Sequence, residues 1–215
     1  MLNEKAKIAN LHYLYADLPE EKAHKKASRR LSKLGYELDK KNTNKDVLTA
    51  TKGDNVHINY SGTNIRNPRD IISDIALATG VQRINPQFRE RRQKTRSIMR
   101  EYGDNKDYTL GGHSLGGSIA LNNVSQSKSI RDRVSKVDVF NSGYTLPFHN
   151  SIKPTDKKIK RVLDKKVNHH RVKGDIVSAH ANKETAFGNL FEYTADKDAD
   201  MLEKHSLDTF TNSDL

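Results

Sequence analysis

A serine flanked by glycines is the part of this sequence best suited to chemistry. Residues 112–116 (GHSLG) match the pattern G-x-S-x-G, between a β-type run at 108–110 and a small-residue run expected to be helical. A sharp turn from strand to helix lifts the serine hydroxyl above the sheet, beside helix N–H groups that favour developing negative charge. Gly112 and Gly116 let the neighbouring backbone approach closely. The segment therefore predicts Ser114 as a nucleophile.

A serine needs a base to activate it and an acid to orient that base. After a strand-to-helix turn of this kind the acid normally follows the serine, and the histidine follows the acid. Asp175 stands just after a predicted strand at 167–172, where the orienting carboxylate is expected. Asp138 is the other nearby acid, but it lies inside a predicted strand, which suits packing or a local hydrogen bond better.

Three downstream regions compete to supply the base. His205 follows a further predicted strand at 190–194 on a separate loop, and we predict it as the base. His180 stays an alternative, although it follows the predicted acid by five residues with no strand between them. The pair at 169–170 precedes that acid inside a strand. His113, within the serine turn, is expected to pack beneath the turn rather than to accept a proton.

The negative charge that develops on the substrate oxygen needs hydrogen-bond donors. The backbone N–H of the residue after the nucleophile, Leu115, is one of them. A second should come from a loop after an earlier strand, and residues 56–63 (VHINYSGT) offer this loop. Gly62 allows a tight approach, and Thr63 can supply a backbone N–H and a hydroxyl together. An ordinary β-turn is the alternative interpretation of this loop.

These segments together resemble the class 3 lipases, the fungal-type lipases and their relatives. The family's nucleophile strand is typically followed by GHSLGG, which residues 112–117 match without a gap. Residues 60–63 (YSGT) are similar to the end of the family's oxyanion strand, 174–177 to its acid loop and 205–207 to its histidine segment. The resemblance covers roughly residues 45–210. The chain differs from secreted fungal members in being shorter and free of cysteine.

The resemblance implies an α/β-hydrolase that cleaves carboxylic esters of acyl lipids, triacylglycerol or phospholipid, through an acyl-enzyme intermediate. Ser114, Asp175 and His205 would form the catalytic triad, with Thr63 and Leu115 as the oxyanion hole. No metal or organic cofactor is expected. Residues 67–80 hold an apolar cluster that could form a lid over an acyl pocket or belong to the core: Ile71, Ile72, Ile75 and Leu77.

Two other functions stay compatible with the sequence. An esterase or thioesterase for small soluble acyl compounds would use the same chemistry with a different pocket. A lipase-like protein without activity could serve as a structural or membrane-binding component. The presence of a serine, an acid and a histidine in the expected order argues against this second function, because an inactive scaffold does not need all three.

The remaining elements are expected to form an α/β domain. Residues 3–35 predict two helical segments, which we assign to an N-terminal unit (1–35) that packs on the main domain (36–215). Three short β-type runs then predict antiparallel strands: 36–40, 47–51 and 56–60. From about residue 56, strands alternate with helices predicted at 86–103, 118–124 and 154–165. This alternation predicts a mostly parallel central sheet flanked by helices.

The charge of the chain favours an anionic partner. Lysine and arginine number 38 against 27 acidic residues, a formal charge of +11, and basic side chains concentrate at 89–100 and 153–166. We therefore expect contact with an anionic membrane or lipid surface. No basic motif interleaved with aromatic residues supports specific nucleic-acid binding.

Composition also limits where the protein works. Without cysteine, neither a disulfide framework nor a thiolate metal site can form. The first 26 residues lack the apolar run of a signal peptide, and no stretch approaches the ~18 apolar residues of a membrane span. We expect a soluble protein, intracellular or virus-associated. The sequence does not determine its oligomeric state.

Overall fold

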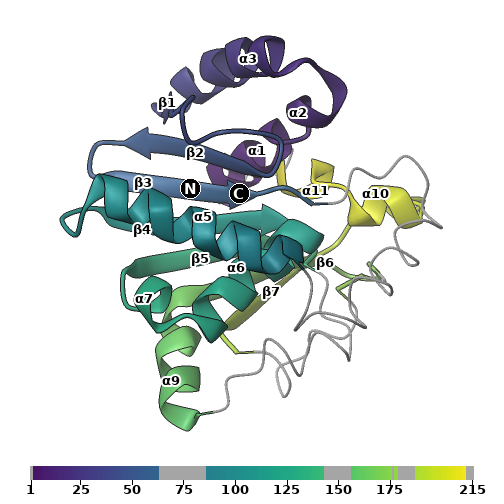
Figure 1. Ribbon diagram of the computed structural model, residues 1–215. Helices are drawn as coiled ribbons and strands as arrows, with labels where there is room; N and C mark the ends of the chain where they lie inside the picture. Colours follow the sequence, from purple (N-terminus) through teal and green to yellow (C-terminus); the bar gives the residue numbers. More distant parts are fainter. Residues whose placement is uncertain (1, 63–85, 143–155, 176, 179–186, 212–215) are drawn as a thin grey trace.

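A seven-stranded sheet forms the centre of the computed structural model, which describes residues 2–62, 86–142, 156–175, 177–178 and 187–211 (Figure 1). The strands are β1 (Glu37–Leu38), β2 (Val47–Lys52), β3 (Asn55–Tyr60), β4 (Asp107–His113), β5 (Val134–Phe140), β6 (Val167–Val172) and β7 (Asn189–Tyr193). They lie side by side in chain order; the pairings from β1 to β3 are antiparallel, and those from β3 to β7 are parallel. The predicted mostly parallel α/β fold is confirmed.

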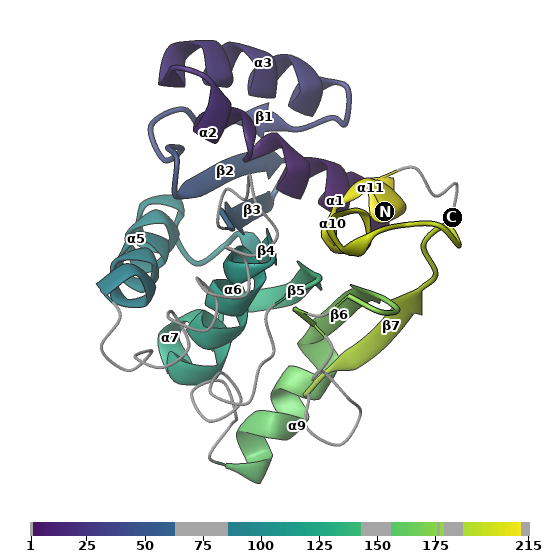
Figure 2. The ribbon, with the colours of Figure 1, turned by 90° about the vertical axis from the view of Figure 1, so that its right-hand side faces the viewer.

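Helices lie on both sides of this sheet. They are α1 (Leu2–Leu11), α2 (Leu14–Asp17), α3 (Glu20–Ser32), α5 (Pro86–Tyr102), α6 (Leu115–Gln126), α7 (Lys128–Arg131), α9 (Lys157–Lys166), α10 (Met201–His205) and α11 (Asp208–Thr211). Helices α5, α6 and α7 lie on one side, and α1, α10 and α11 on the other (Figure 2). None of the helices in the described ranges is long and apolar enough to cross a lipid bilayer.

The main core lies between the sheet and helices α5 and α6. Alternate side chains of a strand point to opposite faces, so one apolar set of each strand faces these helices. Ile58 of β3, Leu110 of β4 and Val137 of β5 are fully buried there together with Ile119 of α6. This packing fixes the position and direction of β4 and α6 relative to each other. These two elements flank Ser114.

Two smaller clusters join the N-terminal helices to the rest of the chain. Ile8 of α1 and Leu31 of α3 are buried against Leu48 of β2. On the other side of α1, alanines pack against α11 and the end of β5, in a cluster that includes Ala6, Ala9, Phe140, Leu207 and Phe210. The division of the chain at residue 35 stays a prediction.

The elements around Ser114 are longer than the sequence predicts. The apolar run at 108–110 predicts a three-residue strand, but β4 continues through Gly111 and Gly112 to His113 because β3 and β5 pair with it on both edges. Helix α6 begins at residue 115 rather than 118. Glycine has a low intrinsic helix propensity. Gly116 and Gly117 therefore led to a predicted helix start that is three residues too late.

Buried neutral histidines should make the stability of this fold depend on pH. Burial lowers the pKa of His12 and of His169 to about 4 and, together with the nearby His205, lowers the pKa of His113 to about 3, from the usual 6.5. Between pH 6.5 and 4 the unfolded chain therefore binds protons that the folded chain does not. The free energy of unfolding should fall as pH falls through this window, by up to ~1.4 kcal/mol per pH unit for each histidine.

Urea titrations at several pH values between 4 and 7 measure this slope. His12→Asn should reduce the slope by the contribution of one proton, which is up to ~1.4 kcal/mol per pH unit. For Asp138 and Asp175, burial raises the pKa, but hydrogen bonds and nearby positive charges together lower it more. The pKa of both carboxyl groups therefore lies below the usual aspartate value of 3.8 and outside this window. A free energy of unfolding that stays constant from pH 6.5 to 4 would contradict the prediction.

Candidate active site

Ser114 occupies a strained turn between β4 and α6. Its backbone has φ 55° and ψ −125°, a left-handed φ that few non-glycine residues adopt. The backbone N–H of Ser114 donates to the carbonyl of Phe140 at 3.0 Å, which holds the turn against β5. The side chain is buried, and its Oγ has no hydrogen-bond partner among the described residues. This is the sharp strand-to-helix turn expected from the sequence.

The glycines beside Ser114 are required by the close approach of the backbone. A Cβ at Gly116 would overlap the carbonyl oxygen of Tyr60, and one at Gly112 would overlap the carbonyl group of Gly116. A Cβ at Gly117 would lie 2.7 Å from the Cβ of Ser142. Helix α6 can therefore start directly above the ends of β3 and β4 only when these positions lack side chains.

Asp175 and His205 form a buried pair. The Nδ1–H of His205 donates to Oδ1 of Asp175 at 2.8 Å, and both side chains are almost fully excluded from solvent. Ser178 donates to the other carboxylate oxygen from its backbone N–H (2.9 Å) and its hydroxyl (2.5 Å). Burial raises the pKa of Asp175, but the hydrogen bonds from His205 and Ser178 lower it below its usual value. Asp175 is therefore an ionised acceptor, and Nε2 of His205 is left as the basic nitrogen.

The backbone around His205 is held by Asn141, which sequence reasoning missed. The Asn141 amide donates to the carbonyls of Lys204 (2.9 Å) and His205 (3.1 Å), while its Oδ1 accepts the N–H of Val172 at 2.8 Å. Asn141 itself has φ 39°. Asparagine adopts a positive φ more readily than most residues. The run Asn-Ser-Gly directly after a predicted strand could have pointed to Asn141 in the sequence.

His113 and Tyr13 support the same segment from below. The Nε2–H of His113 donates to the carbonyl of His205 at 2.6 Å, and the Tyr13 hydroxyl donates to Nδ1 of His113 at 2.6 Å. The rings of His113 and His205 lie 4.8 Å apart. With its pKa lowered to about 3 by burial and His205, His113 stays neutral and both its nitrogens are engaged. It packs beside the turn, as predicted; nothing in the sequence pointed to Tyr13.

Loss of the Tyr13 hydroxyl should weaken the support of His205. In Tyr13→Phe, the buried Nδ1 of His113 loses its donor, which should lower the free energy of unfolding by about 1–3 kcal/mol. If His205 shifts with it, ester turnover should fall about tenfold, mainly in kcat. Tyr15→Phe is the matched control, because the Tyr15 hydroxyl has no partner in the described part of the structure. Equal effects of the two variants on kcat would rule out this positioning role.

The remaining predicted site residues divide into two groups. Thr63, His180 and the segment 67–80 lie outside the described residues. Leu115 is the first residue of α6, so its backbone N–H has no intrahelical acceptor. A Cβ on Gly62 would lie 3.4 Å from the Cβ of Ser114, so the backbone two residues after β3 lies next to the serine.

The alternative acid and bases inside strands have other partners. Asp138 is the acceptor of the Asn168 amide at 2.9 Å and lies 3.3 Å from Nε2 of His170. Nε2 of His169 donates to the carbonyl of Phe187 at 2.9 Å. These groups stabilise β5, β6 and β7, and within the described ranges none of them is a hydrogen-bond partner of the Ser114 hydroxyl.

The assembled groups are those required for nucleophilic acyl transfer. In the part of the chain that the structure describes, Oγ of Ser114 and Nε2 of His205 are both buried and have no hydrogen-bond partner, and no hydrogen bond joins them. A serine on a strained turn, a neighbouring Asp–His pair and a free helix N–H are the components that chemistry of this kind uses.

Comparisons with known proteins place the chain near solved lipase structures. Neither a protein-family model nor a curated protein sequence matches it. A lipase from Rhizopus microsporus var. chinensis aligns with a TM-score of 0.48 and 12% identity, over 92% of this chain and 74% of that one. The native lipase propeptide complex of Rhizomucor miehei aligns with a TM-score of 0.43 and 15% identity, over 71% of this chain. The chain spans about half the length of that protein (53%).

Proposed function

We propose that this chain is a serine hydrolase that cleaves carboxylic esters of acyl lipids. The observation that supports it most is the combination of Ser114 at φ 55°, in a turn between strand and helix, with the buried Asp175–His205 pair held beside that turn. A strained serine and a buried ionised carboxylate both cost stability, and such features concentrate at functional sites.

The proposed reaction has two steps. Oγ of Ser114 attacks the ester carbonyl while Nε2 of His205 takes the hydroxyl proton, and His205 then donates that proton to the departing alcohol. Asp175 keeps the other proton on Nδ1 and stabilises the imidazolium. Water, activated by the same Nε2, then releases the fatty acid and restores Ser114. The backbone N–H of Leu115 and a donor from Thr63 would stabilise the oxyanion in both steps.

The lipid class of the substrate rests on the motifs and on charge. GHSLGG at 112–117 and YSGT at 60–63 resemble the class 3 lipase motifs. Several basic side chains of α5 and α9 are exposed: Arg89, Arg96 and Arg100 on α5, and Lys157, Lys158 and Arg161 on α9. Such side chains attract anionic lipid, which makes a phospholipid at least as suitable a substrate as triacylglycerol.

A fluorophosphonate probe, with peptide mapping of the adduct, tests the hydrolase. Labelling at Ser114 that requires folded protein supports the proposal. A series of p-nitrophenyl acyl esters from short to long then separates an esterase from a lipase. Sedimentation with vesicles of increasing anionic lipid content, at low and high salt, tests the surface interaction. If neither labelling nor turnover occurs, even with anionic vesicles present, the catalytic function is excluded and a structural or membrane-binding role takes its place.

A further inference from the structure

The second face of the sheet is unusually polar. Parallel strands are normally apolar on both faces, because helices cover both. On three adjacent strands, the side chains that point away from the main core are polar. They are Thr109 on β4, Asp138 on β5, and Asn168 and His170 on β6. Buried polar groups of this kind are costly unless they have partners or a function. The polar side chains on this face of the sheet must therefore have partners or a function.

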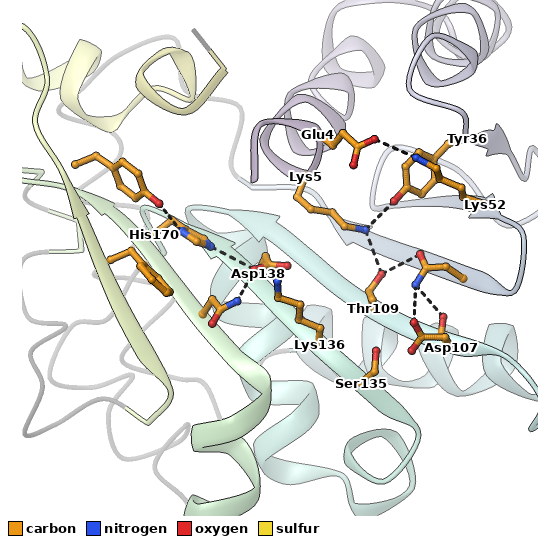
Figure 3. Close-up of a pocket in the computed structure, with 14 residues that line it drawn as sticks. Glu4, Lys5, Tyr36, Lys52, Asp107, Thr109, Ser135, Lys136, Asp138 and His170 are labelled. Carbon is orange, nitrogen blue, oxygen red and sulfur yellow. Dashed lines mark hydrogen bonds and ion pairs between the residues drawn. The ribbon is translucent and has the colours of Figure 1, made fainter. Parts of the chain in front are cut away.

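A cavity of about 570 Å³ opens over this face, between α1 and β7 (Figure 3). Its volume lies in the range of small-molecule sites. Asp107 lines it from the first residue of β4, and Ser135 and Asn168 from the second residues of β5 and β6, whereas Ser114 follows the last residue of β4. The cavity is thus separate from the candidate active site and contains none of its residues.

Lys5 lines this cavity and has no counter-ion among the described residues. Its Nζ donates to the Tyr36 hydroxyl at 3.1 Å and to Oγ1 of Thr109 at 3.4 Å (Figure 3). It also lies 3.3 Å from Nδ1 of His57. These three groups are neutral. Among the residues that the structure describes, no carboxylate oxygen forms an ion pair with Lys5. Burial lowers the pKa of Lys5 to about 8, and the negative charges of Asp138, Glu4 and Asp107 only partly offset this effect.

The carboxylates of the cavity are already engaged by other groups. Their partners are Lys52 for Glu4 (3.1 Å), Asn55 for Asp107 (3.2 Å), and Asn168 (2.9 Å) and His170 (3.3 Å) for Asp138. Lys136 lies 3.7 Å from Asp138 and is half exposed, so it can turn toward a ligand. An anionic group from outside would supply what Lys5 lacks.

We propose that this cavity binds a small organic anion, whose carboxylate or phosphate group is received by Lys5. Lys136 and the Ser135 hydroxyl line the same cavity and can donate further hydrogen bonds. The ring of Phe191, which is 43% exposed and stacked on His170 at 5.2 Å, offers contact for the apolar part of the ligand. This site is independent of the proposed hydrolase.

Calorimetric titration of the full chain with inorganic phosphate, acetate and phenyl phosphate tests the site. All three share the oxyanion, and only the last carries a ring. We expect phenyl phosphate to bind more tightly than inorganic phosphate, and Lys5→Met to weaken both by at least about tenfold. Lys7→Met, an exposed lysine of the same helix, should bind as the wild type does. Lys136→Met should weaken binding several-fold and carries little risk to folding, because the side chain is half exposed.

Controls separate loss of the site from loss of the fold. Lys5→Met should retain ester turnover and melt at or above the wild-type temperature, because it removes a part-buried ammonium group that forms no ion pair within the described ranges. If phenyl phosphate and inorganic phosphate bind with equal affinity, Phe191 has no role in binding, and the site recognises the oxyanion alone. Absence of binding for all three probes at millimolar concentration, or unchanged binding in both Lys5→Met and Lys136→Met, would overturn the proposal.

Discussion

Ser114→Ala is expected to lower ester turnover by about 10⁴-fold or more and to abolish fluorophosphonate labelling. Removal of a nucleophile leaves only binding and oxyanion stabilisation, which contribute the residual rate. The same change removes a buried hydroxyl that has no partner in the described structure, so the free energy of unfolding should stay equal or rise by about 1 kcal/mol. Loss of activity without loss of stability is the signature of a functional residue.

Ser125→Ala is the matched control, because it removes a buried hydroxyl from α6, the helix that begins directly after Ser114. It should leave turnover within about twofold of the wild type. Initial rates, labelling and urea unfolding on all three proteins complete the comparison. Turnover that persists in Ser114→Ala would mean that another group is the nucleophile, and the assignment of Ser114 would be wrong.

Asp175→Asn is expected to lower kcat by about 10³–10⁴-fold. The amide is similar in size, but its Nδ2 can donate to Nδ1 of His205 and so place the histidine proton on Nε2, where the base must be free. Asparagine also removes the negative charge that stabilises the imidazolium. Turnover should therefore fall much more than substrate affinity, and the few molecules labelled by fluorophosphonate should still carry the label on Ser114.

The chain contains its own control for this variant. Asp138 is another buried carboxylate that contacts a histidine, His170, at 3.3 Å. Asp138→Asn should change stability but keep turnover within about threefold of the wild type. If Asp138→Asn were the more damaging of the two to kcat, the roles assigned to the two acids would have to be exchanged.

The sequence predicted best those features that local backbone geometry requires. The glycines at 112 and 116 cannot carry a Cβ where the helix meets the strands, so the pattern around Ser114 is visible in the sequence. Alternation of apolar residues likewise predicted the strands that bury Ile58 and Leu110. Asp175 and His205 were predicted from chain order, and the structure adds the 2.8 Å contact that order cannot give.

Residues that act over long distances in the chain were not predictable. Tyr13 contacts a residue 100 positions later, and its type and neighbours are those of any helix-end tyrosine. Asn141 holds carbonyls 63 and 64 positions away through a side chain that would fit an ordinary turn. No periodicity records such contacts, because they depend on how separate elements meet.

The clustering of α1 with α11 has a consequence for how the protein matures. Tyr13 supports His113, which holds His205 92 residues further on, and Ala6 and Ala9 pack against Leu207 and Phe210. A ribosome must therefore synthesise the chain past residue 210 before α1 can make its contacts with Leu207 and Phe210. Contacts of such high sequence separation form slowly, since a long loop must close first. A nascent chain would thus hold Ser114 without a supported base, and the proposed hydrolysis would begin only after synthesis has passed α11.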